Sequence, residues 1–379
     1  MEELIGWAKE IRKEFHKIPE IGLETVETVK KVKKIMTGFG FTVIPIEKNS
    51  CVCILKKGKG EKVLAFRADM DALLISEETG CEFSSKNEGC MHACGHDMHI
   101  SMALAVGNFA QGYDFNGTLI VIFQSGEEGC DGSEVMLKEG KLLSKIPKPD
   151  LIYGIHVWPE FDVGTTVLTK GPLMASSSFF QLQIKGKGAH GSTPQKSIDP
   201  ILIGSQIVVN CQSIVSRLTS PFDPLVLSVT AFNGGSSTNV IPESVKMMGT
   251  FRSYNDQLRI RSEKVFIKMI NNTCEMYGAT NKIKLKGLPT TTNDEGAIDY
   301  IHDLAKEVSK KIVYDYQTMA SEDFSLFLHK IKGAFIFIGC KNEDQKYVNK
   351  LHHPKNLPSS NALGYGIKLF AKIIEKHLK

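Results

Sequence analysis

The sequence places three histidines, a cysteine and an aspartate within nine consecutive positions, residues 91–99, which read MHACGHDMH. Imidazole and thiolate groups are preferred ligands of zinc and similar divalent ions. Histidine is sparse elsewhere, because the whole chain has only 11. The segment therefore predicts a metal site, and its residue types alone leave open which side chains bind.

Further ligand-type side chains follow three apolar runs, VLAFRA (63–68), TLIVIF (118–123) and LIYGI (151–155). Such nearly continuous runs are typical of strands buried on both faces, in a parallel or mixed sheet that helices cover. Ligands of open α/β sheets gather outside the carboxyl ends of the strands. We therefore expect the residues at these ends to join the 91–99 segment: Asp69, Asp71, Glu127, Glu128 and His156.

The number of candidate ligands bears on the number of ions. Cys94, His96, His156 and one of the paired glutamates would fill a single site, which leaves His352 and His353 as surplus. Two divalent ions with a shared water form a standard hydrolytic centre and would use the surplus. One glutamate could then bind metal while the other takes a proton from the water. The sequence has no G-x-S-x-G segment that would indicate a nucleophilic serine instead.

The elements that must position these residues indicate an α/β fold with a mixed sheet. Helical patterns alternate with the apolar runs in the first half, including one expected at 133–143. Residues 176–287 then have the order β-α-β-β-α-β, the ferredoxin-like unit. We therefore predict a catalytic domain formed by 1–175 and 288–379, with 176–287 inserted as a second domain.

Composition excludes several functional classes. The chain has 379 residues, a net charge of +4 and scattered Lys and Arg residues, so we expect no nucleic-acid partner. No apolar run approaches the ~18 residues of a membrane span, so we expect no membrane association. Nine cysteines without regular spacing do not suggest a disulfide framework. A reducing cytoplasm is the expected location.

Nine motifs together resemble the N-acyl-amino-acid amidohydrolases of the aminoacylase/carboxypeptidase metallopeptidase superfamily. The nearest branch contains hippurate hydrolase, indoleacetyl-amino-acid hydrolases and N-acetyldiaminopimelate deacetylase. The motifs span nearly the whole chain: RADMDAL (67–73), MHACGHD (91–97), EEG (127–129), IHVWP (155–159), GAHGSTP (188–194), NVIPES (239–244), GTFRS (249–253), SEDF (321–324) and LHHP (351–354).

The resemblance implies which side chains act. It implies two divalent ions, of Zn, Mn, Ni or Co, with Glu127 as the general base and Asp69 orienting a metal-binding histidine. His92 and His99 are not carried over as ligands, and His99 is expected on a helix face. The implied metal ligands are Cys94, which bridges, and His96, Glu128, His156 and His352.

The resemblance also assigns the inserted domain as a lid that forms the contact of a homodimer or homotetramer. His190 would stabilise the oxyanion, and Asn239 and Arg252 would bind substrate, with Arg252 able to clamp a carboxylate. The implied reaction is hydrolysis of the amide bond of a small N-acyl-amino acid. The alternatives are a carboxypeptidase or dipeptidase of the same superfamily, or a catalytically silent protein that binds acylated amino acids.

Overall fold

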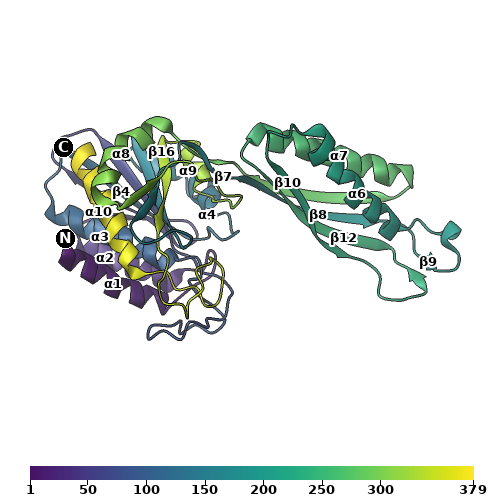
Figure 1. Cartoon of the computed structure of the whole chain (residues 1–379), viewed down its shortest axis with the longest axis horizontal. Coiled ribbons are helices and arrows are strands. Elements are labelled where there is room, and N and C mark those ends of the chain that lie inside the picture. Colours follow the sequence, from purple (N-terminus) through teal and green to yellow (C-terminus); the bar gives the residue numbers. More distant parts are fainter. The chain divides into compact units, whose positions relative to one another are not determined.

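The computed structural model describes residues 1–379, which form two compact units (Figure 1). Unit 1 comprises Met1–Gly171, Thr292–Tyr316 and Asp323–Lys379. Unit 2 comprises Pro172–Thr291 and Gln317–Glu322, and thus includes the residues for which the sequence predicts a separate domain.

Unit 1 is built on one eight-stranded sheet, in the order β1-β2-β4-β3-β5-β16-β6-β15. Strands β3, β4, β5 and β16 form parallel pairs in the middle of the sheet, whereas β1, β2 and β6 form antiparallel pairs. The sheet is therefore mixed, as predicted. Its strands are β1 (Thr42–Ile46), β2 (Ser50–Lys57), β3 (Val63–Asp69), β4 (Gly117–Gln124), β5 (Leu151–Trp158), β6 (Thr165–Val167), β15 (Lys311–Val313) and β16 (Gly333–Gly339).

Helices cover this sheet, and the most deeply buried of them is α3 (His96–Gly112). Helices α1 (Glu2–His16), α2 (Val26–Gly38) and α10 (Leu363–His377) all pack against α3, and Figure 1 shows the four together. Helix α10 also packs on α8 (Glu295–Val308). The start of α3 is therefore enclosed by other elements, which matters because His96 is its first residue.

Two parts of unit 1 differ from the sequence expectation. The helix expected at 133–143 is broken into α4 (Gly132–Glu134), a π-helical turn (Val135–Glu139) and α5 (Leu142–Lys145). The break follows from Gly140, which packs against Ile46, and from Lys141, which has a left-handed φ of 48°. The hairpin of β1 and β2 was not predicted, and left-handed Lys48 and Asn49 lie in its turn.

Unit 2 has the predicted β-α-β-β-α-β order. Its antiparallel sheet has the order β10-β12-β8-β13, and α6 and α7 pack on it. Asp199 and Asn255 cap these helices by accepting hydrogen bonds from backbone N–H groups of the first turn. The elements are β8 (Ser176–Lys185), β9 (Ala189–His190), α6 (Pro200–Leu218), β10 (Leu225–Asn233), β11 (Val240–Ile241), β12 (Ser244–Ser253), α7 (Asp256–Met276) and β13 (Thr280–Leu288).

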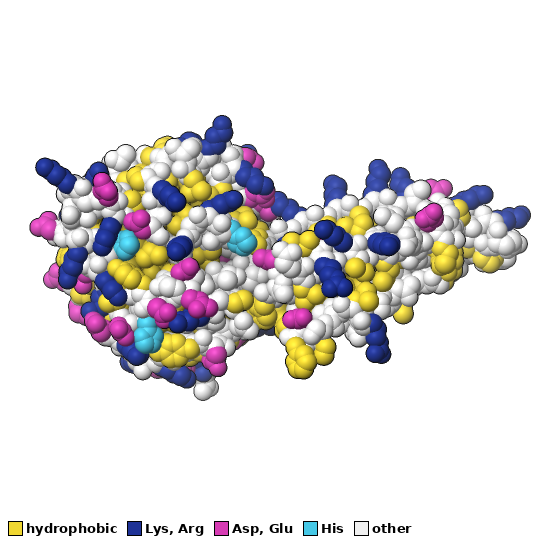
Figure 2. All heavy atoms as spheres, turned by 90° about the horizontal axis from the view of Figure 1, so that it is seen from above, with side chains coloured by type: hydrophobic (Ala, Val, Ile, Leu, Met, Phe, Trp, Pro, Cys, Tyr) yellow, Lys and Arg dark blue, Asp and Glu magenta, His cyan; other side chains and the backbone are white.

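The short remaining elements complete the chain. Strands β7 (Gly171–Met174) and β14 (Thr291–Asn293) lie where the chain passes between the units, and α9 (Ser325–Leu328) belongs to unit 1. Only α6 has the length and apolar composition of a membrane span; this is weak evidence for one, since residues such as Ile203 and Ile207 pack in the core of unit 2. On the face of unit 1 seen in Figure 2, Lys and Arg side chains are interspersed with Asp and Glu.

Candidate metal centre

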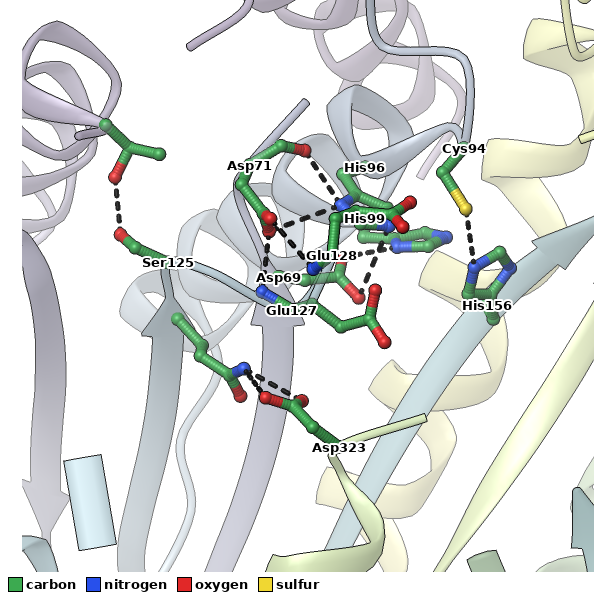
Figure 3. Close-up of polar contacts among 12 residues, drawn as sticks. Asp69, Asp71, Cys94, His96, His99, Ser125, Glu127, Glu128, His156 and Asp323 are labelled. Carbon is green, nitrogen blue, oxygen red and sulfur yellow. Dashed lines mark hydrogen bonds and ion pairs between the residues drawn. The ribbon is translucent and has the colours of Figure 1, made fainter. Parts of the chain in front are cut away.

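The candidate ligands of unit 1 come from the ends of adjacent strands and the start of one helix (Figure 3). Asp69 ends β3, the Glu127–Glu128 pair follows β4, and His156 lies near the end of β5. These three strands are parallel neighbours, so their carboxyl ends meet at the same edge of the sheet. The turn before α3 adds Cys94 at this edge, as the sequence predicts.

Cys94 lies between two groups of side chains. Its sulfur is 3.4 Å from Nε2 of His156 and 3.3 Å from Nε2 of His352, and the latter nitrogen is 3.1 Å from Oε1 of Glu128. Within each of two groups, Cys94–His96–His156 and Cys94–Glu128–His352, the ligand atoms lie within 4.8 Å of one another. Two groups that share one sulfur match the arrangement expected for two ions with a bridging ligand.

Hydrogen bonds present the correct nitrogen of two histidines to the centre. Nδ1 of His96 lies 2.8 Å from the backbone oxygen of Asp71, and Nδ1 of His156 lies 2.7 Å from that of Val157. A carbonyl accepts, so each Nδ1 carries a proton, and Nε2 is the nitrogen that offers its lone pair when the ring is neutral. Nε2 of His96 is buried and makes no hydrogen bond. These side chains therefore fit a metal ion.

The electrostatics of the centre also fit cations. Burial raises the pKa of the Cys94 thiol well above its usual range, and the carboxylates of Glu128, Glu127 and Asp69 raise it further. Burial and the neighbouring His99 hold the pKa of His156 well below its usual range, which favours the neutral, metal-binding imidazole. A thiolate among carboxylates at this depth requires positive charge close by, which divalent ions would provide.

The paired glutamates are fixed by Asp71. The backbone N–H groups of Glu127 and Glu128 donate to the two carboxylate oxygens of Asp71, at 3.0 Å each. Gly126 and Gly129 flank the pair with left-handed φ values of 78° and 74°, which allow the tight turn. Both glutamates lie beside His96, with the three ligand atoms within 4.8 Å of one another. The pair thus faces the centre with its backbone anchored.

Asp69 differs from its expected role. Its Oδ1 is 2.6 Å from Nδ1 of His99, and its Oδ2 accepts from Arg67 at 2.7 Å, whereas Nε2 of His96 is 3.8 Å away. Asp71, which the sequence places at the same strand end but without a specific role, accepts the hydrogen bond from His96 through its backbone oxygen instead. Although burial alone would raise the pKa of Asp69, His96, His99 and Arg67 lower it well below its usual range.

His99 is buried, and both of its ring nitrogens are used within the protein. Nδ1 donates to Asp69, while Nε2 accepts a hydrogen bond of 2.9 Å from the backbone N–H of Val157. His99 therefore has no lone pair left for a metal ion, in agreement with its exclusion as a ligand. It links α3 to the end of β5 and so steadies the strand that carries His156.

A second buried network lies below the glutamate turn. Arg67 donates to Gln124 at 2.9 Å and to Asp323 at 2.8 Å, and the Gln124 amide in turn donates to Asp323. Asp323 also accepts the backbone N–H of Ser133. No role was predicted for this aspartate, although it belongs to the SEDF motif; the structure shows Asp323 tying β3, β4 and α4 together.

Of the two adjacent late histidines, His352 reaches the centre. Its backbone N–H donates to the carbonyl oxygen of Ala93 at 3.1 Å, and the amide of Asn356 donates to the same oxygen at 2.9 Å. Nδ1 of His353 accepts a hydrogen bond from the backbone N–H of Lys355, so its side chain stabilises the local turn. His352 has a left-handed φ of 59°, which is uncommon for a residue other than glycine.

The three other predicted site residues belong to unit 2. Nδ1 of His190 accepts hydrogen bonds from the backbone and hydroxyl of Ser192, and His190 pairs in register with Val240. The carbonyl of Asn239 accepts from Gly191, so Asn239 lies beside His190. Arg252, in β12, donates to Ser321 at 2.6 Å and lies over the ring of Phe179.

The fold and the ligand-type side chains are those of a metal-dependent hydrolase. Residues 65–376 match the model of Peptidase family M20/M25/M40. The chain belongs to this family, and the resemblance drawn from its motifs is confirmed.

The alignments with several related proteins cover nearly the full chain. Hippurate hydrolase of Campylobacter jejuni is 35% identical, and the match covers 100% of this chain and 98% of that protein. N-acetyldiaminopimelate deacetylase of Streptococcus sanguinis is 31% identical, with 96% and 97% covered. Thermostable carboxypeptidase 1 of Saccharolobus solfataricus is 32% identical, with 99% and 96% covered.

A solved structure from Bacillus subtilis, described as a dinuclear metal binding peptidase from the M20 family, has the same fold. It is 29% identical with a TM-score of 0.82, and the match covers 99% of each chain.

Proposed function

We propose that this enzyme hydrolyses the amide bond of N-acyl-amino acids, and that it uses two divalent ions to do so. The observation that carries the proposal is the position of Cys94, whose sulfur is shared by two groups of ligand atoms next to the paired glutamates. The names of the hippurate hydrolase and deacetylase relatives support the substrate class.

The residues of unit 1 bind the metal ions and transfer the proton. Cys94 belongs to both groups of ligand atoms and would be shared by the two ions; His96 and His156 would complete one group, and Glu128 and His352 the other. When bound, the ions lower the pKa of water and polarise the scissile carbonyl. Glu127 then takes a proton from the attacking water and delivers it to the nitrogen of the leaving amino acid. No side chain forms a covalent bond to the substrate.

Unit 2 supplies the remaining roles. His190 stabilises the negative charge that develops on the carbonyl oxygen, while Asn239 and Arg252 bind the substrate. Arg252 suits the free carboxylate of an amino acid, because a guanidinium can form two parallel hydrogen bonds to it. Its hydrogen bond to Ser321 supports this role by fixing the side chain before substrate binds.

Three further features are part of the proposal. The ions are Zn, Mn, Ni or Co, which all accept imidazole ligands. The active form is a homodimer or homotetramer that associates through unit 2, whose exposed apolar residues include Val209 on α6 and Phe222. The location is the cytoplasm, which is supported by nine cysteines that form no disulfide.

A substrate panel tests the reaction. Apoprotein reconstituted with Mn²⁺, Zn²⁺, Ni²⁺ or Co²⁺ should release free amino acid from hippurate or acetyl-methionine. Hydrolysis of dipeptides alone would favour the carboxypeptidase or dipeptidase alternative. Binding of acyl-amino acids without turnover under every metal would favour the catalytically silent alternative.

Glu127→Gln tests the base. The amide cannot take up a proton, so turnover should fall by about 10²–10⁴-fold, while metal content stays at the level of the unmodified enzyme. Glu139→Gln, at an exposed position on the nearby π-helical turn, is the matched control and should keep full turnover. Retained turnover in Glu127→Gln would remove Glu127 from the mechanism.

A further inference from the structure

A buried ion network lies at the start of α3, next to the candidate ligands but separate from them. Nε of Arg12 and Nδ1 of His16 both lie 2.9 Å from Oδ2 of Asp97. Nε2 of His16 lies 3.3 Å from Oε1 of Glu77. All four side chains are nearly or completely buried, with at most 4% exposed. None of the proposed catalytic roles uses them.

The network joins segments that carry different ligands. Asp97 directly follows His96 in the first turn of α3. Nη1 of Arg12 donates to the carbonyl of Pro358 at 2.7 Å and to the hydroxyl of Ser360 at 2.5 Å. Those two residues end the loop that carries His352. Arg12 therefore connects the turn with Cys94 and His96 to the loop with His352 through one guanidinium.

The two groups of ligands depend on this connection to different degrees. His156 lies in β5, which pairs with strands on both sides, and His96 is oriented by Asp71. His352 instead lies in an irregular loop, and its side chain is 51% exposed. The position of His352 relative to Cys94 thus depends on a few contacts, and the bond from Arg12 to the end of this loop is one of the buried ones.

Buried charges of this kind are costly to desolvate, and removing one partner leaves the other charge buried and unpaired, so the partners hold one another in place. We propose that Arg12 and His16 are positioning residues for the metal centre: they hold Asp97, Pro358 and Ser360 so that the His352 loop meets the Cys94 turn. They thereby set the affinity of the ion bound by Cys94, Glu128 and His352. This inference rests on the proposed two-ion centre.

Titration of the apoprotein with Co²⁺ tests the inference, because binding can be followed by calorimetry and by the Co²⁺ absorption spectrum without any substrate. The unmodified protein should bind two equivalents. Arg12→Lys keeps the positive charge but loses the forked hydrogen bonds, so one Co²⁺ should bind at least tenfold more weakly and the other without change. His16→Gln should weaken the same ion.

Arg259→Lys is the matched control. Arg259 forms a buried ion pair with Glu263 in unit 2 and a hydrogen bond to Ser178, so the substitution perturbs a comparable interaction in the other unit. It should leave both Co²⁺ affinities unchanged even if it lowers the melting temperature. An equal loss in Arg259→Lys and Arg12→Lys would mean a general effect of stability and would overturn the inference.

The outcomes separate this inference from the proposed function. If the unmodified protein binds fewer than two Co²⁺, the two-ion centre is wrong, and the positioning role of Arg12 falls with it. If it binds two and Arg12→Lys binds both equally well, only the positioning role is wrong. Should Arg12→Lys not fold, Ser360→Ala removes a single hydrogen bond to the same guanidinium; unchanged affinities there would also overturn the inference.

Discussion

Replacing His16 with Gln should remove a pH-dependent part of the stability of unit 1. His16 is completely buried between Asp97 and Glu77, with Arg12 close by and the ring of His92 at 6.3 Å. Although burial alone would lower it, Asp97 and Glu77 raise the pKa of His16 from 6.5 to about 9. Burial lowers the pKa of His92 to about 3, so this neighbour stays neutral.

The sign and size of the effect depend on the pKa of His16. The folded state binds the proton more tightly than the unfolded chain, so the full stabilisation is present below pH 6.5 and is lost as the pH rises through about 9. The change in pKa from 6.5 to about 9 corresponds to about 3 kcal/mol. Gln does not titrate, so the free energy of unfolding of the variant should lack this decrease as the pH rises.

The assay is urea denaturation of the unmodified protein and His16→Gln at a series of pH values from 6 to about 10. The quantity of interest is the difference between their free energies of unfolding. Buried thiols and His96 titrate in both proteins, so their contributions to the pH dependence cancel in this difference. This difference should shrink by about 3 kcal/mol across the range.

A difference that stays constant from pH 6 to about 10 would refute the reasoning, since it would mean that the folded and unfolded chains bind the proton of His16 equally tightly and that folding does not raise its pKa. A difference that grows with pH would show that His16 is neutral at low pH and that burial outweighs the two carboxylates. Either result would show that the contacts of His16 with Asp97 and Glu77 are neutral hydrogen bonds, while the ion pair of Arg12 with Asp97 would remain.

Three further predictions concern the metal and the packing. Chelation should lower the melting temperature, and free Mn²⁺ at about 100 times its dissociation constant should restore about 3 kcal/mol of stability per site, as measured by thermal shift. Phe66→Ala should cost about 3–5 kcal/mol in urea denaturation, because Phe66 is fully buried and stacks on Phe370 at 3.9 Å. Gly333→Ala should prevent normal folding, since its Cβ would lie 1.9 Å from the carbonyl oxygen of Ile152. The Cβ of Gly6→Ala meets nothing within 4 Å, so this variant should gain about 0.5–1 kcal/mol in its free energy of unfolding. Equal circular dichroism melts for the two glycine variants would contradict this contrast.

The sequence alone predicts the convergence of the centre because the runs before Asp69, Glu127 and His156 are almost continuously apolar. Such runs become buried parallel strands, and parallel strands bring the residues at their carboxyl ends to one edge of the sheet. The ferredoxin-like order of unit 2 is predictable for a similar reason, since its helices and strands are long and their caps are clear.

Other features have no local signal in the sequence. The helix expected at 133–143 has a suitable apolar pattern, but Gly140 lies against Ile46 of β1, a strand from a distant part of the chain, and the helix ends there. The role of Asp71 depends on a loop that folds back onto the glutamate turn, so that one carboxylate meets two backbone N–H groups. Spacing cannot distinguish Asp71 from Asp69, two residues before it.

The charges of the centre argue for two ions over one. Cys94, Glu127, Glu128 and Asp71 together bring four negative charges when ionised, whereas the charge of Asp69 is already offset by Arg67 at 2.7 Å. One divalent ion would leave a buried negative charge facing a substrate that itself carries a carboxylate, which the low local dielectric makes unfavourable. Two ions would balance these charges, and their positive charge would lie where the carboxylate of the substrate and the developing negative charge on its carbonyl oxygen need it. The buried carboxylates, the shared thiolate and an anionic substrate therefore favour two filled groups of ligands over one.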